Sequence, residues 1–419
     1  MSKKPAKLAK SSLNHLHSSD LGAVAQLAID ATHGVTTMVE GVHHAVLGTM
    51  GLNGGKAQPR TGGITGFVYR AVHGVTELVG KGLQAAFTRL EPALADLVDA
   101  PPDTPEREAV LAALNGVIGD QLALSHNPLA TPMTLRYQGR VINLHTLEPI
   151  PGATGKVLLL IHGLCMNDLQ WQAGAGVDGK PESDHGATLA AELGYTPVYL
   201  RYNTGLHTSQ NGRKLASMLE QLLARWPVPV KDVTVLVHSM GGLVIRSAVQ
   251  TAEHSGLQWP RQLKNIVFLG TPHHGAPLER AGNWIDVVLG STPFSKPFAK
   301  LGQLRSSGIT DLRYGFVQDS DWQGHDRFMR KPDSRQPLPL PSGVACYTVA
   351  ATTAAKRSTV ADRVVGDGLV PPASALGQHD NPMLQLSFAK ANQAIVYRTS
   401  HMALLNSPEV TRQVVEWLK

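Results

Sequence analysis

Short runs of apolar and β-branched residues recur along the C-terminal two thirds of the chain, each with the length of a buried β-strand. Segments with helical spacing of apolar residues separate them, so strands and helices alternate. The pattern predicts an α/β fold with a mostly parallel, doubly wound sheet and right-handed crossovers. A hairpin, turned by Gln138-Gly139, is expected first. The predicted strands are residues 133–137 and 140–144 of the hairpin, then 156–161, 197–202, 233–238, 265–270, 344–350 and 394–398.

Residues 1–130 have a different pattern, without clear strands and with apolar residues at helical spacing. Residues 31–39 and 71–79 form a weak internal repeat, and a further helix is predicted at 105–124, with Pro105 in its first turn. The chain therefore divides into a helical N-terminal extension, 1–130, and a larger domain, 131–419. Three roles remain open for the extension: packing against the larger domain, anchoring to a membrane or polymer surface, and self-association.

Composition adds a limit on partners. A chain of 419 residues is longer than most domains with a single hydrophobic core. Its content of 42% hydrophobic and 17% charged residues is ordinary for a globular enzyme. The formal net charge is +6, but Lys3, Lys4, Lys7 and Lys10 supply four of these charges. The rest of the chain is near neutral, which argues against a nucleic-acid surface. The four lysines favour contact with anionic lipid instead.

The most informative stretch places a serine directly after the strand 233–238. A serine between a buried strand and a helix lies on a sharp turn that exposes its hydroxyl. Gly241 and Gly242 allow the helix to begin close to the strand. This arrangement predicts that Ser239 is a nucleophile, the alternative being a serine that caps the helix. Val237 replaces the first glycine of G-x-S-x-G, and its branched side chain is expected to crowd the turn.

Two later segments supply partners for this serine. Asp367 lies between two glycines after the strand 344–350, and His401 follows the strand 394–398. Ser239, Asp367 and His401 occur in the chain order of the α/β-hydrolase triad. All three are expected at the carboxyl ends of strands, where open α/β sheets bind ligands. The alternatives are that Asp367 only holds its own turn and that His401 is a surface histidine.

A second loop resembles an oxyanion site. The first parallel strand ends in His162-Gly163-Leu164, and a loop opening there can aim backbone N–H groups at a developing negative charge. Leu164 and Met240 are the predicted donors. His162, Gly163 and His238 are expected to line the substrate site.

The two cysteines, Cys165 and Cys346, are not expected to form a disulfide, and no Cys/His spacing indicates a metal site. Cys165 as a catalytic thiol is an alternative that lacks the strand–turn–helix context. No secretory signal is convincing, and nowhere do about 18 apolar residues run together. A soluble cytoplasmic protein is expected, with peripheral membrane contact through the N-terminal extension as an alternative.

Together these motifs resemble the α/β-hydrolases of the lipase/esterase kind, in particular the group of bacterial triacylglycerol lipases and inositol-deacylase-like hydrolases. The resemblance covers about residues 130–419, and the order of motifs is more specific than any one of them. It implies an α/β-hydrolase fold and hydrolysis through an acyl-enzyme intermediate without a cofactor. The segments that carry it are His162-Gly163-Leu164, residues 238–242, residues 269–275, Gly366-Asp367-Gly368 and Ser400-His401.

Residues 276–343 are far too many for a simple crossover. The resemblance implies that this insertion is a cap over the active site. Its aromatic side chains belong either to a small core of the cap or to the wall of an acyl pocket. Its acids Asp319, Asp321 and Asp326 lack the spacing of an EF-hand and are expected to be solvated loop acids rather than calcium ligands. The aromatic residues are Trp284, Phe294, Phe298, Trp322 and Phe328.

The predicted reaction is hydrolysis of a carboxylic ester. Ser239 attacks the carbonyl, His401 transfers the proton, and Asp367 orients His401. The expected substrate is a small-molecule or lipid ester. Two rivals remain: a lipid acyltransferase or membrane-lipid deacylase with the same triad, and a catalytically silent scaffold.

Overall fold

The computed structural model describes residues 105–146, 150–172, 184–276, 305–324, 333–355 and 366–419. The chain divides into two compact units. One comprises residues 1–107 and 122–130, and the other comprises 108–121 and 131–419 and holds the whole sheet. The helix predicted at 105–124 is present as α3 (Pro105–Leu124). The N-terminal repeat lies outside the described residues.

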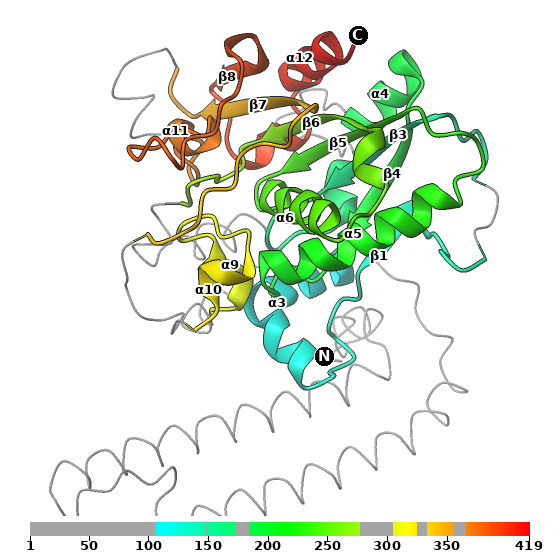
Figure 1. The fold of residues 1–419 in the computed structure, drawn as a ribbon, viewed down its shortest axis with the longest axis horizontal. Coiled ribbons are helices and arrows are strands. Elements are labelled where there is room, and N and C mark those ends of the chain that lie inside the picture. The colour runs from blue at the N-terminus through cyan, green and yellow to red at the C-terminus, as the bar shows by residue number, and fades with distance from the viewer. Residues whose placement is uncertain (1–104, 147–149, 173–183, 277–304, 325–332, 356–365) are drawn as a thin grey trace, which may run out of the picture. The chain divides into compact units, whose positions relative to one another are not determined.

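Eight strands form one sheet in the order β2-β1-β4-β3-β5-β6-β7-β8 (Figure 1). The hairpin strand β1 (Thr134–Tyr137) runs antiparallel to both β2 (Arg140–Val141) and β4 (Thr196–Arg201). All other neighbouring strands are parallel, which confirms the predicted fold class. The remaining strands are β3 (Lys156–Ile161), β5 (Asp232–His238), β6 (Leu263–Leu269), β7 (Ala345–Thr352) and β8 (Gln393–Tyr397).

Both hairpin strands are shorter than predicted, β1 by one residue at its start. The second hairpin strand ends at Val141 rather than at residue 144. Both of its residues are exposed, and it has β1 as its single neighbour at the sheet edge. One further bond joins the hairpin, from the Ile142 N–H to the Leu135 carbonyl at 2.8 Å, and the chain then turns at residues 144–146.

Both faces of the sheet are covered, which explains why its strands read as continuous apolar runs. In β3, Val157, Leu159 and Ile161 join one core cluster, while Leu158 and Leu160 join the cluster on the other face. Helices α5 (Thr208–Ala224) and α6 (Gly241–His254) cover the first face, side by side in Figure 1. The second face packs on η1 (Asp168–Trp171), α4 (His185–Leu193) and α12 (Pro408–Leu418).

Short helical segments complete the described chain. The described part of the insertion contains α9 (Ser307–Asp311) and α10 (Asp319–Trp322). The Ser306 hydroxyl accepts from the Ile309 N–H and so caps α9. The other segments are η2 (Trp259–Gln262), α11 (Pro372–Ala375), η5 (Lys390–Asn392) and η6 (Met402–Leu405).

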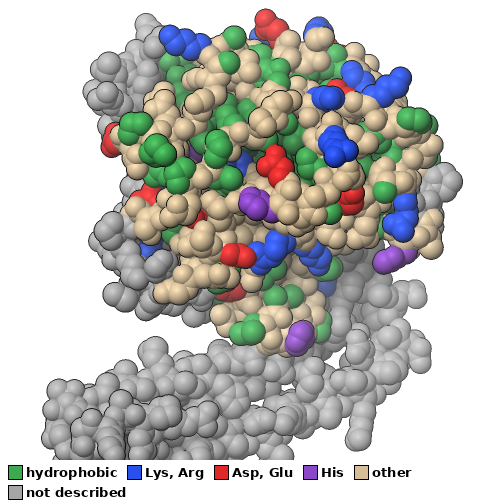
Figure 2. Space-filling model, in the orientation of Figure 1, with side chains coloured by type: hydrophobic (Ala, Val, Ile, Leu, Met, Phe, Trp, Pro, Cys, Tyr) green, Lys and Arg blue, Asp and Glu red, His purple; other side chains and the backbone are tan. Residues whose placement is uncertain are grey.

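The surface of the described part carries both signs of charge. Figure 2 shows Lys and Arg side chains interspersed with Asp and Glu side chains on the face in view. Among the described helices, none combines the length and the apolar character needed to cross a bilayer.

Candidate active site

Ser239 lies on the turn between β5 and α6, in the left-handed backbone region with φ +54°. A residue other than glycine is strained there, by about 1–3 kcal/mol. The Ser239 N–H donates to the Leu269 carbonyl at 2.9 Å, and the Gly242 N–H donates to the Ser239 carbonyl at 3.0 Å. These bonds to the neighbouring strand and the helix start hold the strained turn in place.

The two glycines after Ser239 are required by close contacts. A Cβ atom on Gly241 would lie 2.7 Å from the Ile161 carbonyl oxygen, and one on Gly242 would lie 2.1 Å from the Thr271 hydroxyl. Helix α6 therefore begins against the end of β3 and the residues that follow β6, and not only close to β5 as the sequence predicts. Val237 does not prevent this turn, because its side chain is fully buried in the core cluster beneath α5 and α6.

The imidazole of His401 faces the carboxylate of Asp367, with 2.6 Å between Nδ1 and Oδ2. The other oxygen, Oδ1, accepts from the N–H groups of Leu369 and Val370 at 2.9 and 2.7 Å. Asp367 thus holds its own turn and also faces His401, so the structural role and the proposed catalytic role of this residue are compatible. Because Nδ1 carries the proton in this bond, Nε2 is the free acceptor of a neutral ring. This buried Nε2 has no hydrogen-bond partner within the described residues.

His238 connects the serine turn to His401. Its Nε2 atom lies 2.9 Å from the His401 carbonyl oxygen and must donate, because a carbonyl only accepts. A Cβ atom on Gly270 would lie 3.2 Å from the His401 ring, so this ring packs directly on the chain that follows Leu269. The Ser239 turn and His401 are thus linked through His238 and Gly270, and His401 in turn contacts Asp367.

The loop after β3 runs beside the serine. A Cβ atom on Gly163 would lie 2.9 Å from the Cβ atom of Ser239. Cys165 has φ +59°, so the chain reverses directly after Leu164, and the Cys165 N–H donates to the Thr204 hydroxyl at 3.2 Å. Neither the Leu164 N–H nor the Met240 N–H donates to another described residue. The structure thus brings the loop expected to stabilise an oxyanion next to the proposed nucleophile.

Residues 152–340 match the family model described as "PGAP1-like alpha/beta domain". This match agrees with the strand order of the sheet and with the turn that holds Ser239. The domain has the α/β-hydrolase fold. No curated protein sequence matches the chain.

Several solved structures are similar to this hydrolase domain. The mature lipase BlEst2 of Bacillus licheniformis is 16% identical, over 69% of this chain and 98% of that chain, with a TM-score of 0.41. Lipase B of Aspergillus fumigatus is 11% identical, over 68% and 56%, with a TM-score of 0.39. Lipase 1 of Pelosinus fermentans is 12% identical, over 63% and 97%, with a TM-score of 0.38.

Two residues predicted to line the substrate site are placed differently in the hydrolase domain. The rings of His162 and His238 are fully buried, and each lies beside a backbone carbonyl. His162 stacks on Tyr202 with 4.5 Å between ring centroids, and burial lowers the pKa of His162 to about 4. Burial, and then the neighbouring His401 ring, hold the pKa of His238 well below its usual range. These neutral rings support the loops, and only Gly163 lies directly against Ser239.

Cys165 is a poor candidate for a nucleophile. Burial raises the pKa of its thiol to about 12, so almost none of it is thiolate near neutral pH.

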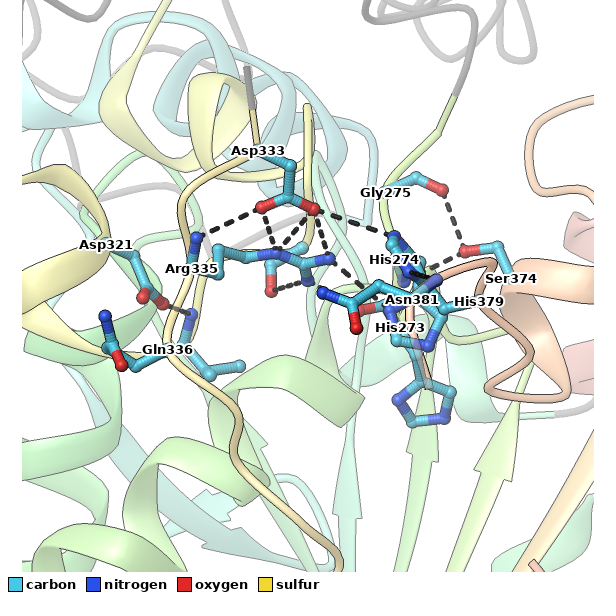
Figure 3. Close-up of polar contacts among 12 residues, drawn as sticks. His273, His274, Gly275, Asp321, Asp333, Arg335, Gln336, Ser374, His379 and Asn381 are labelled. Carbon is cyan, nitrogen blue, oxygen red and sulfur yellow. Dashed lines mark hydrogen bonds and ion pairs between the residues drawn. The ribbon is translucent and has the colours of Figure 1, made fainter. Parts of the chain in front are cut away.

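A polar network fastens the segment after β6 of the hydrolase domain (Figure 3). The Arg335 guanidinium pairs with the Asp333 carboxylate at 2.8 Å and donates to the His273 carbonyl at 3.0 Å. Beside them, the Ser374 hydroxyl accepts from the His274 N–H at 3.1 Å. The network connects the two ends of the insertion, near residues 273–274 and 333–335, to α11. Helix α11 follows the turn that holds Asp367. Sequence reasoning missed it, because no motif links residues so far apart along the chain.

The described part of the insertion docks on α5 of the hydrolase domain. Trp322 stacks on His207, with 3.7 Å between ring centroids, and donates from Nε1 to the Ser209 hydroxyl at 3.0 Å. Trp322 therefore docks the insertion on the start of α5, a role outside the two expected for these aromatic residues. The other four, Trp284, Phe294, Phe298 and Phe328, lie outside the described residues.

Of the three insertion acids expected to be solvated, the two described ones have protein partners, and Asp321 is buried. Asp319 pairs with Arg213, and Asp321 accepts from the N–H groups of Val317 and Gln318 at 2.9 Å. Within the described ranges, no group of three or more His, Cys, Asp or Glu side chains is arranged to hold a metal ion. Asp326 is not among the described residues.

Proposed function

We propose that this hydrolase is a serine esterase or lipase that cleaves carboxylic esters by acyl transfer. The Ser239 hydroxyl oxygen attacks the ester carbonyl while Nε2 of His401 accepts the hydroxyl proton. His401 then gives this proton to the departing alcohol, which leaves an acyl group on Ser239. Water, deprotonated by His401, attacks the acyl-enzyme and releases the acid and the free serine. Asp367 keeps His401 in the required tautomer and stabilises the imidazolium that forms.

The observation that carries this proposal is the 2.6 Å bond between His401 and Asp367 beside a serine at φ +54°. A serine that only capped α6 would need neither the strained backbone nor a carboxylate-bound imidazole nearby. The buried, unpartnered Nε2 of His401 supports the role of general base.

Two backbone donors, the N–H groups of Leu164 and Met240, stabilise the oxyanion in this mechanism. Both belong to segments that contact the serine turn, and both lack another acceptor among the described residues. A donor of this kind commonly contributes about 3 kcal/mol to the stability of the transition state.

A fluorophosphonate probe and a series of nitrophenyl esters, from acetyl to palmitoyl, test the proposal. We expect the full chain to be labelled on Ser239 and to hydrolyse at least one ester of the series. Ser239→Ala should abolish both signals. A wild-type protein that shows neither would be the silent scaffold instead.

The same triad could pass the acyl group to an alcohol other than water. Long-chain acceptor alcohols added to the assay separate the two reactions. Free acid as the main product supports hydrolysis, and a new ester as the main product supports a lipid acyltransferase. Release of acid from a phospholipid in vesicles, with little turnover of soluble esters, would point to a membrane-lipid deacylase.

A further inference from the structure

Helix α3 precedes the first strand and lies outside the segment that matches the family model, yet its residues 108–121 belong to the same compact unit as the sheet. It packs on the loop after β3. A Cβ atom on Gly116 would lie 2.2 Å from the Cys165 sulfur and 3.0 Å from the Cys165 backbone nitrogen. Any side chain at Gly116 would therefore displace the residue that follows Leu164.

Hydrogen bonds and ion pairs tie α3 to both flanks of this loop. The Asn167 side chain donates from Nδ2 to the Glu108 carbonyl at 3.1 Å. The buried Arg201 pairs with the carboxylates of both Glu108 and Asp168. The Asn203 side chain donates to the Gly119 carbonyl at 2.8 Å. The loop after β3 is thus held between α3 and the end of β4.

Helix α3 also reaches the second proposed oxyanion donor through α9. The Ser306 hydroxyl donates to the Gly116 carbonyl at 2.6 Å, and Ser307 donates from both N–H and hydroxyl to Asp120 at 3.0 Å. In the same helix, a Cβ atom on Gly308 would lie 3.1 Å from the terminal methyl of Met240. Cys165, which follows Leu164, and α9, which contacts the Met240 side chain, therefore both contact residues 116–120 of α3.

This turn of α3 is irregular. Ile118 has φ −134° and ψ 17°, so the helix bends between Gly116 and Gly119. Both glycines face the segments described above, Gly116 the Cys165 loop and Gly119 the Asn203 side chain. The bend lets a helix that precedes the sheet follow the surface of the active-site loops.

We propose that α3 positions the oxyanion loop of this hydrolase, with Gly116 as the positioning residue. The inference rests on the proposed function. The backbone of Cys165 sets the direction of the peptide next to Leu164, so a shift of a few tenths of an ångström at Cys165 moves the Leu164 N–H. Hydrogen-bond stabilisation of a transition state depends on such placement, whereas ground-state binding of the ester depends on it little.

Gly116→Ala in the full chain tests the proposal. We expect kcat to fall by about tenfold or more while KM stays within about twofold. Labelling by the fluorophosphonate should slow, and a boronic acid that mimics the tetrahedral intermediate should bind more weakly by a similar factor. The matched control is Gly212→Ala, because a Cβ atom there would lie 2.4 Å from the Ser247 hydroxyl, in a helix contact between α5 and α6. Gly212→Ala should lower the melting temperature with kcat unchanged.

A second substitution should restore the loop. Cys165→Gly removes the sulfur that Gly116→Ala would meet, and glycine suits the positive φ at this position. The double variant should regain most of the lost kcat. If Gly116→Ala does not fold, Asn167→Asp provides the same test, because it removes the donor to the Glu108 carbonyl but keeps the oxygen that caps η1.

Three results would overturn the positioning role: wild-type kcat in the loop variants, an equal loss of kcat in Gly212→Ala, or no recovery in the double variant. An active wild type combined with any of these leaves the proposed function intact. A wild type with neither ester hydrolysis nor labelling would overturn the proposed function and this inference with it.

Discussion

The side chain of His238 donates from Nε2 to the carbonyl oxygen of His401 at 2.9 Å. The residue before the proposed nucleophile thereby fixes the backbone of the proposed base. The two rings also lie close, with 4.6 Å between their centroids. Because the buried carbonyl has to be satisfied, loss of this donor would cost about 1–3 kcal/mol or force His401 to move.

His238→Phe should therefore lower kcat by about tenfold or more, since small misplacements of a catalytic group have large effects on rate. His238→Gln keeps a donor at similar reach and should recover part of the loss. Steady-state kinetics, together with thermal unfolding of each variant, check this. Wild-type kcat in a folded His238→Phe protein would contradict the positioning role of His238.

Ser239→Ala should abolish ester hydrolysis and leave the melting temperature nearly unchanged. Within the described residues the Ser239 hydroxyl makes no hydrogen bond, whereas the turn is held by backbone bonds that alanine retains. Loss of a triad member typically costs several orders of magnitude in kcat. Residual activity above about a tenth of wild type would move the nucleophile elsewhere.

Asp367→Asn should leave the fold intact and lower kcat by about 10³-fold to 10⁴-fold, because an amide facing His401 stabilises the wrong tautomer. The turn should survive, since the amide oxygen can still accept from the N–H groups of Leu369 and Val370. Asp362, five residues before Asp367 in the sequence and outside the described residues, is the nearest competing acid. Severe loss in Asp362→Asn with a mild effect in Asp367→Asn would exchange the two assignments.

Acid should destabilise the protein well before the carboxylates titrate. Burial lowers the pKa of His162 to about 4 and that of His274 to about 3. In the unfolded chain such rings take up a proton near pH 6.5. The contribution of each neutral ring to the free energy of unfolding is thus complete above this pH, and it falls as the pH is lowered toward the folded pKa, about 4 for His162 and about 3 for His274. Each ring contributes a slope of up to about 1.4 kcal/mol per pH unit.

Urea unfolding at pH 8, 6 and 5 measures this slope. The free energy of unfolding should fall from pH 8 to pH 5, and His162→Gln should make the fall shallower. An equal free energy of unfolding at all three values would show that the buried histidines do not remain neutral.

The N-terminal extension is proposed to contact anionic membranes through Lys3, Lys4, Lys7 and Lys10. Co-sedimentation with anionic liposomes should then be strong at low salt, weak at high salt, and lost when the four lysines are replaced by Gln. Binding by the lysine variant equal to that of the wild type would assign membrane contact to another surface. No binding by either protein would leave the extension with a packing or self-association role.

Local sequence determined the strands, the parallel sheet and the members of the candidate triad. Strands buried on both faces leave continuous apolar runs, and a tight strand–helix turn needs small residues such as Gly241 and Gly242. Both signals lie within a few neighbouring residues, so they can be read from the chain alone. The order of Ser239, Asp367 and His401 could be read for the same reason, because each follows a recognisable strand.

Only the tertiary structure decided which groups surround these residues. His238 meets the His401 carbonyl, Gly270 packs on the His401 ring, and Gly116 faces Cys165 across the boundary drawn from the sequence at residue 130. Such contacts join residues that are distant along the chain and leave no periodicity or spacing. They follow from the order in which the strands assemble and from the need to satisfy each buried polar group, which the whole fold decides at once.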